Sequence, residues 1–118
     1  AALFALLASL GVGNLYWLWL ASYLTTFSVF IRVRSIAEHA MTERDLDPMK
    51  STRTTYAHPL ARVTVAPHRV NYHLEHHLLM TVPYFNLPRM HRKILERGAL
   101  KQANLSSGYC DVLKKAMS

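Results

Sequence analysis

The histidines of the segment "NYHLEHHLLM", residues 71–80, are of the type and spacing that metal chemistry needs. His73, His76 and His77 stand at positions i, i+3 and i+4, which are neighbouring positions on a helix. Three imidazoles beside leucines are costly to bury without partners, and they repel one another when protonated. Neutral imidazole is a good ligand for iron, copper and zinc, and a bound metal keeps it unprotonated. The spacing therefore predicts a metal site, and an unliganded surface cluster is the alternative.

The two adjacent histidines favour two metal ions over one. Consecutive residues of an α-helix are about 100° apart around its axis, so His76 and His77 aim in different directions. We therefore expect the adjacent rings to belong to different ions that lie close together.

The chain that must position these histidines consists of two segments of different composition. It has 118 residues, enough for one small domain, and is 51% hydrophobic with a net charge of +7. No charged residue precedes Arg32, so an uncharged apolar stretch, 1–31, is followed by a basic polar segment, 32–118. The first residue, Ala1, lies inside an apolar run, which indicates a fragment or a processed chain. The basic residues follow this run rather than precede it, which argues against a signal peptide.

The apolar stretch is predicted to form membrane helices. As one straight helix, residues 1–31 would span roughly 46 Å, more than the ~30 Å of a bilayer core. The segment Gly11–Asn14 predicts a break, so that residues 1–10 end one membrane helix and residues 15–31 form a second. The basic residues that begin at Arg32 then place the following segment in the cytoplasm. A buried helical hairpin of a soluble protein is the alternative.

The polar segment is predicted to be mainly helical. Residues 42–55, rich in charge and threonine, indicate a loop. The histidine segment should be helical until Pro83, and a further helix should have Asn86 as its N-cap and Gly98 as its stop. Residues 108–117 predict a short amphipathic helix. The predicted fold class is thus all-α, with integral membrane helices followed by a cytoplasmic helical segment that carries the histidines.

The remaining candidate residues receive structural interpretations. His58 and His68 each adjoin a proline and are interpreted as loop histidines, and His91, among arginines and lysine, as a surface residue. Arg53 is interpreted as a solvated loop residue rather than a ligand for an acyl head group. Cys110 is the only cysteine, so neither an internal disulfide nor a Cys-x-x-Cys site is possible.

One predicted helix carries a basic face, and three kinds of partner could bind it. Anionic lipid head groups are the favoured partner, and an acidic electron carrier is the second. Nucleic acid is disfavoured, because no aromatic or glycine pattern of a binding module accompanies the charge. The residues of this face are Arg89, Arg92, Lys93 and Arg97.

Two longer stretches resemble a known family. The motif His73-x-x-His76-His77 in "NYHLEHHL", followed by "VPYFNLPRMH", closely resembles the third histidine box of membrane fatty acid desaturases. The earlier "RVRSIAEHA" resembles the segment that leaves the last membrane helix of that family. The resemblance covers the whole chain, 1–118, as the C-terminal part of a desaturase domain with its membrane helices in 1–31.

The resemblance implies a cytoplasmic di-iron centre in an integral membrane enzyme that uses dioxygen to introduce a double bond into a fatty acyl chain. By position, His73 and His77 would bind one iron and His76 the other, as catalytic residues, and His39 would add one further metal ligand. The implied partners are a fatty acyl substrate, membrane lipids and an electron donor such as a ferredoxin or a b-type cytochrome.

The chain departs from the family pattern in one large respect. The family has two earlier histidine boxes, but no histidine precedes His39 here, so the isolated fragment is expected to be inactive. One alternative keeps the same di-iron site in a lipid or carotenoid hydroxylase or ketolase. Another is a non-catalytic membrane protein that binds a structural zinc.

Overall fold

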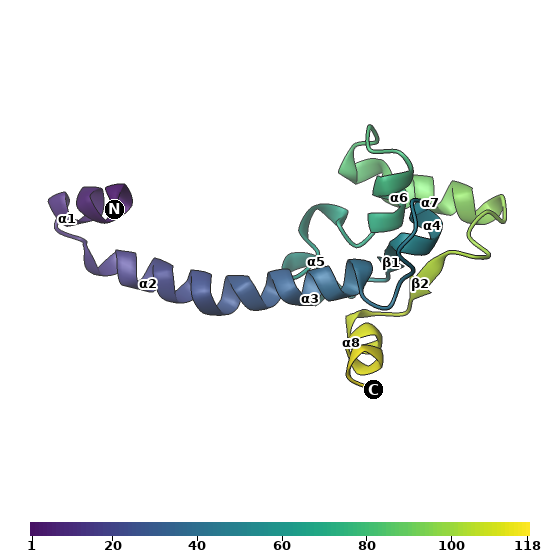
Figure 1. Cartoon of the computed structure of the whole chain (residues 1–118). Coiled ribbons are helices and arrows are strands. Elements are labelled where there is room, and N and C mark those ends of the chain that lie inside the picture. Colours follow the sequence, from purple (N-terminus) through teal and green to yellow (C-terminus); the bar gives the residue numbers. More distant parts are fainter. The chain divides into compact units, whose positions relative to one another are not determined.

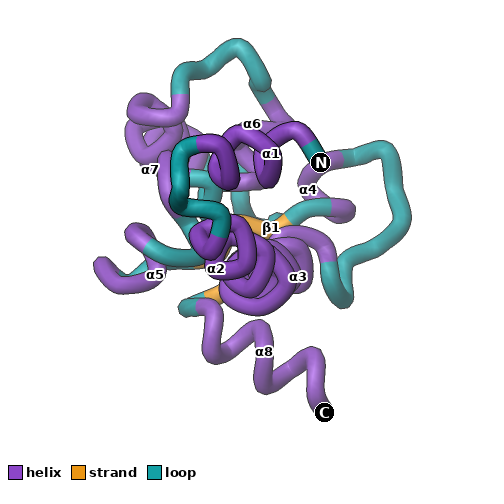
Figure 2. Tube along the Cα trace, turned by 90° about the vertical axis from the view of Figure 1, so that its left-hand side faces the viewer, coloured by secondary structure: helices purple, strands orange, loops and turns teal.

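The computed structural model describes residues 1–118, which form two compact units, Ala1–Arg32 and Val33–Ser118. Helices make up most of both units (Figure 1). Strands are confined to short stretches of the second unit (Figure 2).

The first unit is a helical hairpin followed by further helix. Helix α1 (Ala2–Ser9) and helix α2 (Asn14–Ser22) are joined by a turn in which Gly11 has φ 75°. A residue without a Cβ adopts this left-handed conformation at little cost. The Val12 amide closes the turn by donating to the Leu7 carbonyl over 2.9 Å. The helix break predicted at the glycines is therefore confirmed.

Aromatic side chains connect the two helices of the hairpin. The ring of Phe4 lies edge-on to Tyr16, with centroids 5.3 Å apart, and 6.4 Å from the ring of Trp17. Further along, Trp19 stacks on Tyr23 at 5.8 Å, an i, i+4 pair on one helical face. No residue of α1 or α2 is buried, so these apolar side chains remain largely exposed within the unit.

The prediction of membrane-spanning helices is wrong, because no helix combines the length and the apolar character that a bilayer crossing needs. The region expected to be one long helix is α-helical to Ser22, π-helical in η1 (Tyr23–Phe27) and α-helical again in α3 (Ser28–His39). The hydroxyl of Ser28 donates to the carbonyl of Tyr23 over 2.7 Å within this interruption. Such side-chain bonds compete with the regular backbone ladder, and composition does not reveal them.

The all-α fold class is also wrong, because the second unit contains a small parallel sheet. Strand β1 (Arg53–Thr55) pairs with strand β2 (Asn104–Ser106), with Thr54 opposite Leu105. Thr54 also forms an antiparallel bridge to Tyr72 on the other side of β1. The predicted loop at 42–55 therefore holds a buried strand with two β-branched threonines, preceded by helix α4 (Pro48–Ser51).

The other elements of the second unit are short helices around this sheet. Helix α7 (Leu87–Glu96) follows Asn86, and Gly98 stands just beyond its end with φ 69°, as predicted. Helix α6 (His73–Leu78) ends before Pro83, the limit predicted for the histidine segment. Helices α5 (Pro59–Val63), η2 (Pro67–Arg69), α6 (His73–Leu78), η3 (Tyr84–Asn86) and α8 (Tyr109–Met117) complete the unit.

The core of the second unit is small and partly polar. Its buried apolar residues are Ala37, Ala57, Ala66, Leu74, Leu87, Leu100 and Val112. The side chains of β1 are buried beside them, including that of Arg53. The interpretation of Arg53 as a solvated loop residue is therefore wrong. A core of this kind depends on hydrogen bonds as well as on apolar packing, because a buried polar group is costly unless it is paired.

Candidate metal centre

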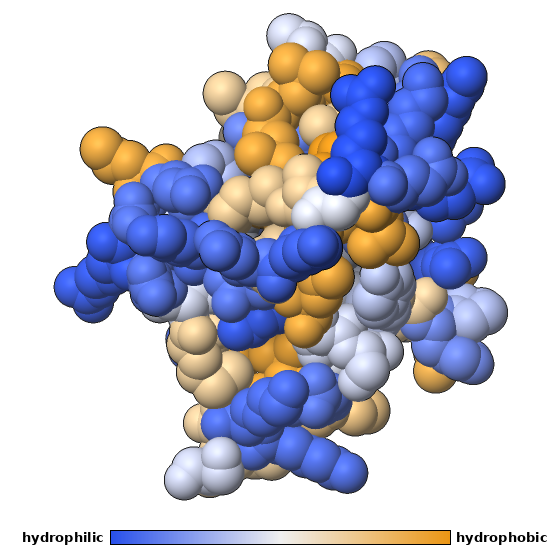
Figure 3. All heavy atoms as spheres, turned by 90° about the vertical axis from the view of Figure 1, so that its right-hand side faces the viewer, coloured by the Kyte–Doolittle hydropathy of each residue, from blue (hydrophilic) through white to orange (hydrophobic).

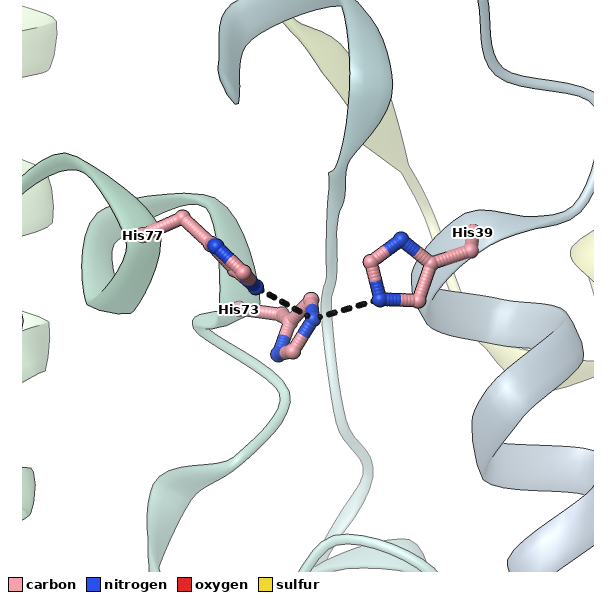
Figure 4. A group of neighbouring side chains, drawn as sticks. All are labelled: His39, His73 and His77. Atoms are coloured by element: carbon pink, nitrogen blue, oxygen red, sulfur yellow. Dashed lines mark hydrogen bonds between the residues drawn. The ribbon is translucent and has the colours of Figure 1, made fainter. Parts of the chain in front are cut away.

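Three histidines from two helices converge on one point (Figure 4). His39 is the last residue of α3, and His73 and His77 lie one turn apart on α6. The Nε2 atom of His73 lies 2.9 Å from Nε2 of His39 and 3.1 Å from Nε2 of His77. One ligand nitrogen from each ring lies within 4.8 Å of the other two. Side chains 34 residues apart in sequence thus form a single cluster.

The end of α3 is fixed from two sides, which orients His39. The carbonyl of Ser51 lies 3.2 Å from Nδ1 of His39 and accepts a hydrogen bond from it. That bond leaves Nε2 unprotonated, with its lone pair directed at the cluster. The buried guanidinium of Arg53 donates to the Ala40 carbonyl over 2.7 Å and to the Ala37 carbonyl over 3.5 Å. Cationic donors at a helix C-terminus satisfy carbonyls that the helix itself leaves free.

Helix α6 is fixed by the residues between its histidines. Leu74 and Glu75 are completely buried, whereas His76 and His77 are exposed and His73 is intermediate. The carboxylate of Glu75 accepts a hydrogen bond from the Thr54 hydroxyl over 2.5 Å. Residues on different faces of a helix point in different directions. Because Glu75 faces the interior of the unit, His73 and His77 face His39 instead.

The burial of His91 differs from the prediction of a surface residue. His91 was expected at the surface, but its side chain is 5% exposed and its Nδ1–H donates to Oε1 of Glu75 over 2.6 Å. The hydroxyl of Tyr56 lies 3.1 Å from its other ring nitrogen. A signal for burial was present: His91 stands four residues after Leu87, on the buried face of α7.

The electrostatics of the cluster disfavour protonation of His73 and His77. Burial first, and then the neighbouring His77, His39 and His76, lower the pKa of His73 to about 3. Burial and His39 also lower the pKa of His77. The Oε1 atom of Glu38 lies 3.8 Å from Nδ1 of His73, which is beyond hydrogen-bond distance. The same oxygen is paired with Nε of Arg34 at 2.7 Å.

The donor set fits a metal cation. With Nδ1 of His39 bonded to Ser51, Nε2 of His39 needs a donor, and only the Nε2–H of His73 is near enough to be one. Nε2 of His77 then also faces a nitrogen that already carries a proton. A neutral ring has one N–H, so the Nε2–H of His73 would have to be shared between the two contacts. A cation would accept all three lone pairs, and nitrogens at about 2.0–2.1 Å from one ion lie roughly this close together.

The fourth candidate, His76, lies apart from the three that converge. It does not belong to the group of ligand nitrogens that lie within 4.8 Å of one another, although its ring centroid is 5.8 Å from that of His77. It lines a cavity of about 270 Å³ together with His73, His68 and Tyr84. Of the predicted site residues, the structure thus brings His39, His73 and His77 together and leaves His76 separate.

One comparison with known proteins gives a match. The family model described as "Fatty acid desaturase" matches residues 1–108, a range that includes all the histidines of the cluster. No curated protein and no solved structure matches the chain.

Proposed function

The chain belongs to the fatty acid desaturase family, and we propose that it contributes the histidine ligands of a di-iron, O2-dependent enzyme that introduces a double bond into an acyl chain. The family implies an oxidoreductase that acts on fatty acyl chains, generally uses a di-iron centre and is associated with membranes. The specific reaction, O2-dependent formation of a double bond in an acyl chain, is what we propose.

The convergence of three imidazole nitrogens is the observation that supports this function. We assign His39, His73 and His77 to one iron, since their Nε2 atoms face one another. We assign His76 to the second iron, because it lies beside the cluster but does not belong to the group of converging nitrogens. One histidine is too few ligands for an ion, so the second iron would need further ligands.

The chain's own residues would hold the metal ligands in position. The Ser51 carbonyl keeps Nε2 of His39 free of a proton, and Glu75 anchors the helix that presents His73 and His77. When bound, iron would supply the reduction of dioxygen and the removal of hydrogen from an unactivated C–H bond. An electron donor such as a ferredoxin or a b-type cytochrome would provide the electrons. We propose that the histidines lie on the cytoplasmic side of the membrane, the side that the resemblance to membrane desaturases implies for the di-iron centre.

The test is to express the chain in a host membrane within an enzyme that also carries the two earlier histidine boxes of the family, and to measure bound iron together with acyl products. We expect two irons per enzyme and products with a new double bond. His73→Ala should lose both iron and product. His58→Ala should keep both, because His58 is exposed and its side chain accepts a hydrogen bond only from the Leu60 amide at the start of α5. Hydroxylated or keto products with the same iron content would assign the alternative reaction. Unchanged turnover in His73→Ala would refute the site.

A structural zinc site remains the second candidate function. It is favoured by the same convergence, since the described residues bring together ligands for one ion and leave His76 apart. One zinc per chain, absence of iron and no acyl product would establish it.

A further inference from the structure

A second feature of the second unit lies away from the histidine cluster. A groove of about 540 Å³ runs between α7 and the loop that follows α6. Its floor is apolar and includes Val82, Pro83, Met90 and Ile94. Leu79 at its edge is 49% exposed, and the next residue, Met80, is 71% exposed. Exposed apolar side chains around a groove indicate a surface that contacts a ligand or partner.

Three cations border this groove along one line of α7. Arg89, Lys93 and Arg97 lie at i, i+4 and i+8, and all three line the groove and are exposed. None of them belongs to any of the ion pairs of the protein. The face that carries the end of α7 accordingly shows strongly hydrophilic residues directly beside a hydrophobic area (Figure 3). The arrangement leaves positive charge without a protein partner at the edge of an apolar floor.

We propose that this groove binds an anionic phospholipid, with the head-group phosphate on Arg89, Lys93 and Arg97 and the start of one acyl chain on the apolar floor. Guanidinium and ammonium groups are the side chains that hold phosphate, the former through paired hydrogen bonds. Basic residues above apolar ones are the arrangement by which helices lie at a lipid interface. An acidic protein would satisfy the cations equally well, but it would not require the exposed leucine and methionine beside them. The groove does not include any of the proposed metal ligands.

The methionines of the chain offer a direct probe. Met90 lines the groove, whereas Met49 lies on α4, Met117 on α8, and Met41 in a cavity beside β2. We would label all methionine methyl groups with ¹³C in the full chain, place it in phosphatidylcholine bicelles and add phosphatidylglycerol. The expected result is a saturable shift of the methyl signals of Met90 and of Met80 beside the groove, with little change at Met41, Met49 and Met117. Bicelles without anionic lipid control for binding through the apolar first unit.

Matched variants separate a built site from general charge attraction. Arg89→Gln combined with Lys93→Gln and Arg97→Gln should weaken the response to phosphatidylglycerol by about fivefold for each residue removed. The control combines Arg44→Gln, Lys101→Gln and Lys114→Gln, which are exposed cations that do not line the groove, and should leave the response unchanged. Both triple variants change the net charge equally and alter only exposed side chains.

A second pair of variants tests the apolar floor. Leu79→Ser should weaken the response, whereas Leu60→Ser, at a position that is 67% exposed and outside the groove, should not. The proposal is overturned if phosphatidylglycerol leaves Met90 unmoved, or if the control triple loses the response as fully as the groove triple. A shift of equal size with inorganic phosphate alone would assign a free-anion site instead. A shift produced by an acidic ferredoxin but not by lipid would assign a protein dock and would also overturn it.

Discussion

The Nδ1 atom of His91 lies 2.6 Å from Oε1 of Glu75, and both side chains are almost completely buried. The pair links α7 to α6, and the hydroxyl of Thr54 adds a bond from β1 to the same carboxylate. Glu75 therefore occupies the junction of three elements, directly between the histidines that face His39. The orientation of the candidate metal ligands depends on this junction.

Removal of the Glu75 carboxylate should destabilise the second unit strongly. Glu75→Ala would leave Thr54 and His91 buried without their partner, and we expect a loss of about 2–5 kcal/mol in the free energy of unfolding. Glu75→Gln keeps an acceptor for one of the two donors and should cost less. Denaturant unfolding followed by circular dichroism measures both, with the exposed Glu96→Ala as the control. Equal stability of Glu75→Ala and Glu96→Ala would contradict the role of the junction.

Cobalt binding should separate the converging histidines from the fourth. His39→Ala, His73→Ala and His77→Ala each remove one ligand nitrogen, so Co²⁺ affinity should fall by more than the roughly 10–100-fold typical of losing an outer-shell partner. His76→Ala should retain this ion, because its ring lies apart from the three. The visible absorption of Co²⁺ reports affinity and coordination number together. An equal loss in His76→Ala would show that the first ion is held differently.

Arg53 should act on the metal centre through the end of α3. Arg53→Met keeps much of the buried volume but removes the donors to the Ala40 and Ala37 carbonyls, at an expected cost of about 1–3 kcal/mol in the free energy of unfolding. His39 lies between Ala37 and Ala40, so Co²⁺ affinity should fall as well. Arg44→Met, at an exposed loop position, is the control for the loss of a charge. A destabilised variant with normal Co²⁺ affinity would separate Arg53 from the site.

The metal-free protein should lose stability in acid because of His73. Burial and the neighbouring imidazoles lower its pKa from the ordinary 6.5 to about 3 in the folded state. Between these pH values the unfolded chain binds a proton that the folded chain does not, so the free energy of unfolding falls as the pH drops through this range. His73→Gln should reduce this dependence, and His58→Gln, at an exposed position, should not. Unfolding measured at several pH values with a chelator present tests it; identical slopes for all three proteins would show that His73 titrates normally.

Several features of the chain were determined locally and could be predicted from the sequence. The glycines after Leu10 predicted the turn between α1 and α2, because residues without a Cβ tolerate a positive φ. Asn86 and Gly98 predicted the limits of α7. Each of these depends only on residues a few positions apart.

Other features were decided by the tertiary structure, because they depend on segments far apart in the chain. The approach of His39 to His73 requires the intervening residues to form α4 and β1 and return to α6. The burial of His91 requires a carboxylate from α6. The parallel pairing of β1 with β2 requires a partner about fifty residues away, a connection length that parallel strands need and that residue patterns near Thr54 do not contain. Composition predicted the apolar character of the first unit correctly, but the course of its backbone hydrogen bonds decided where each helix begins and ends.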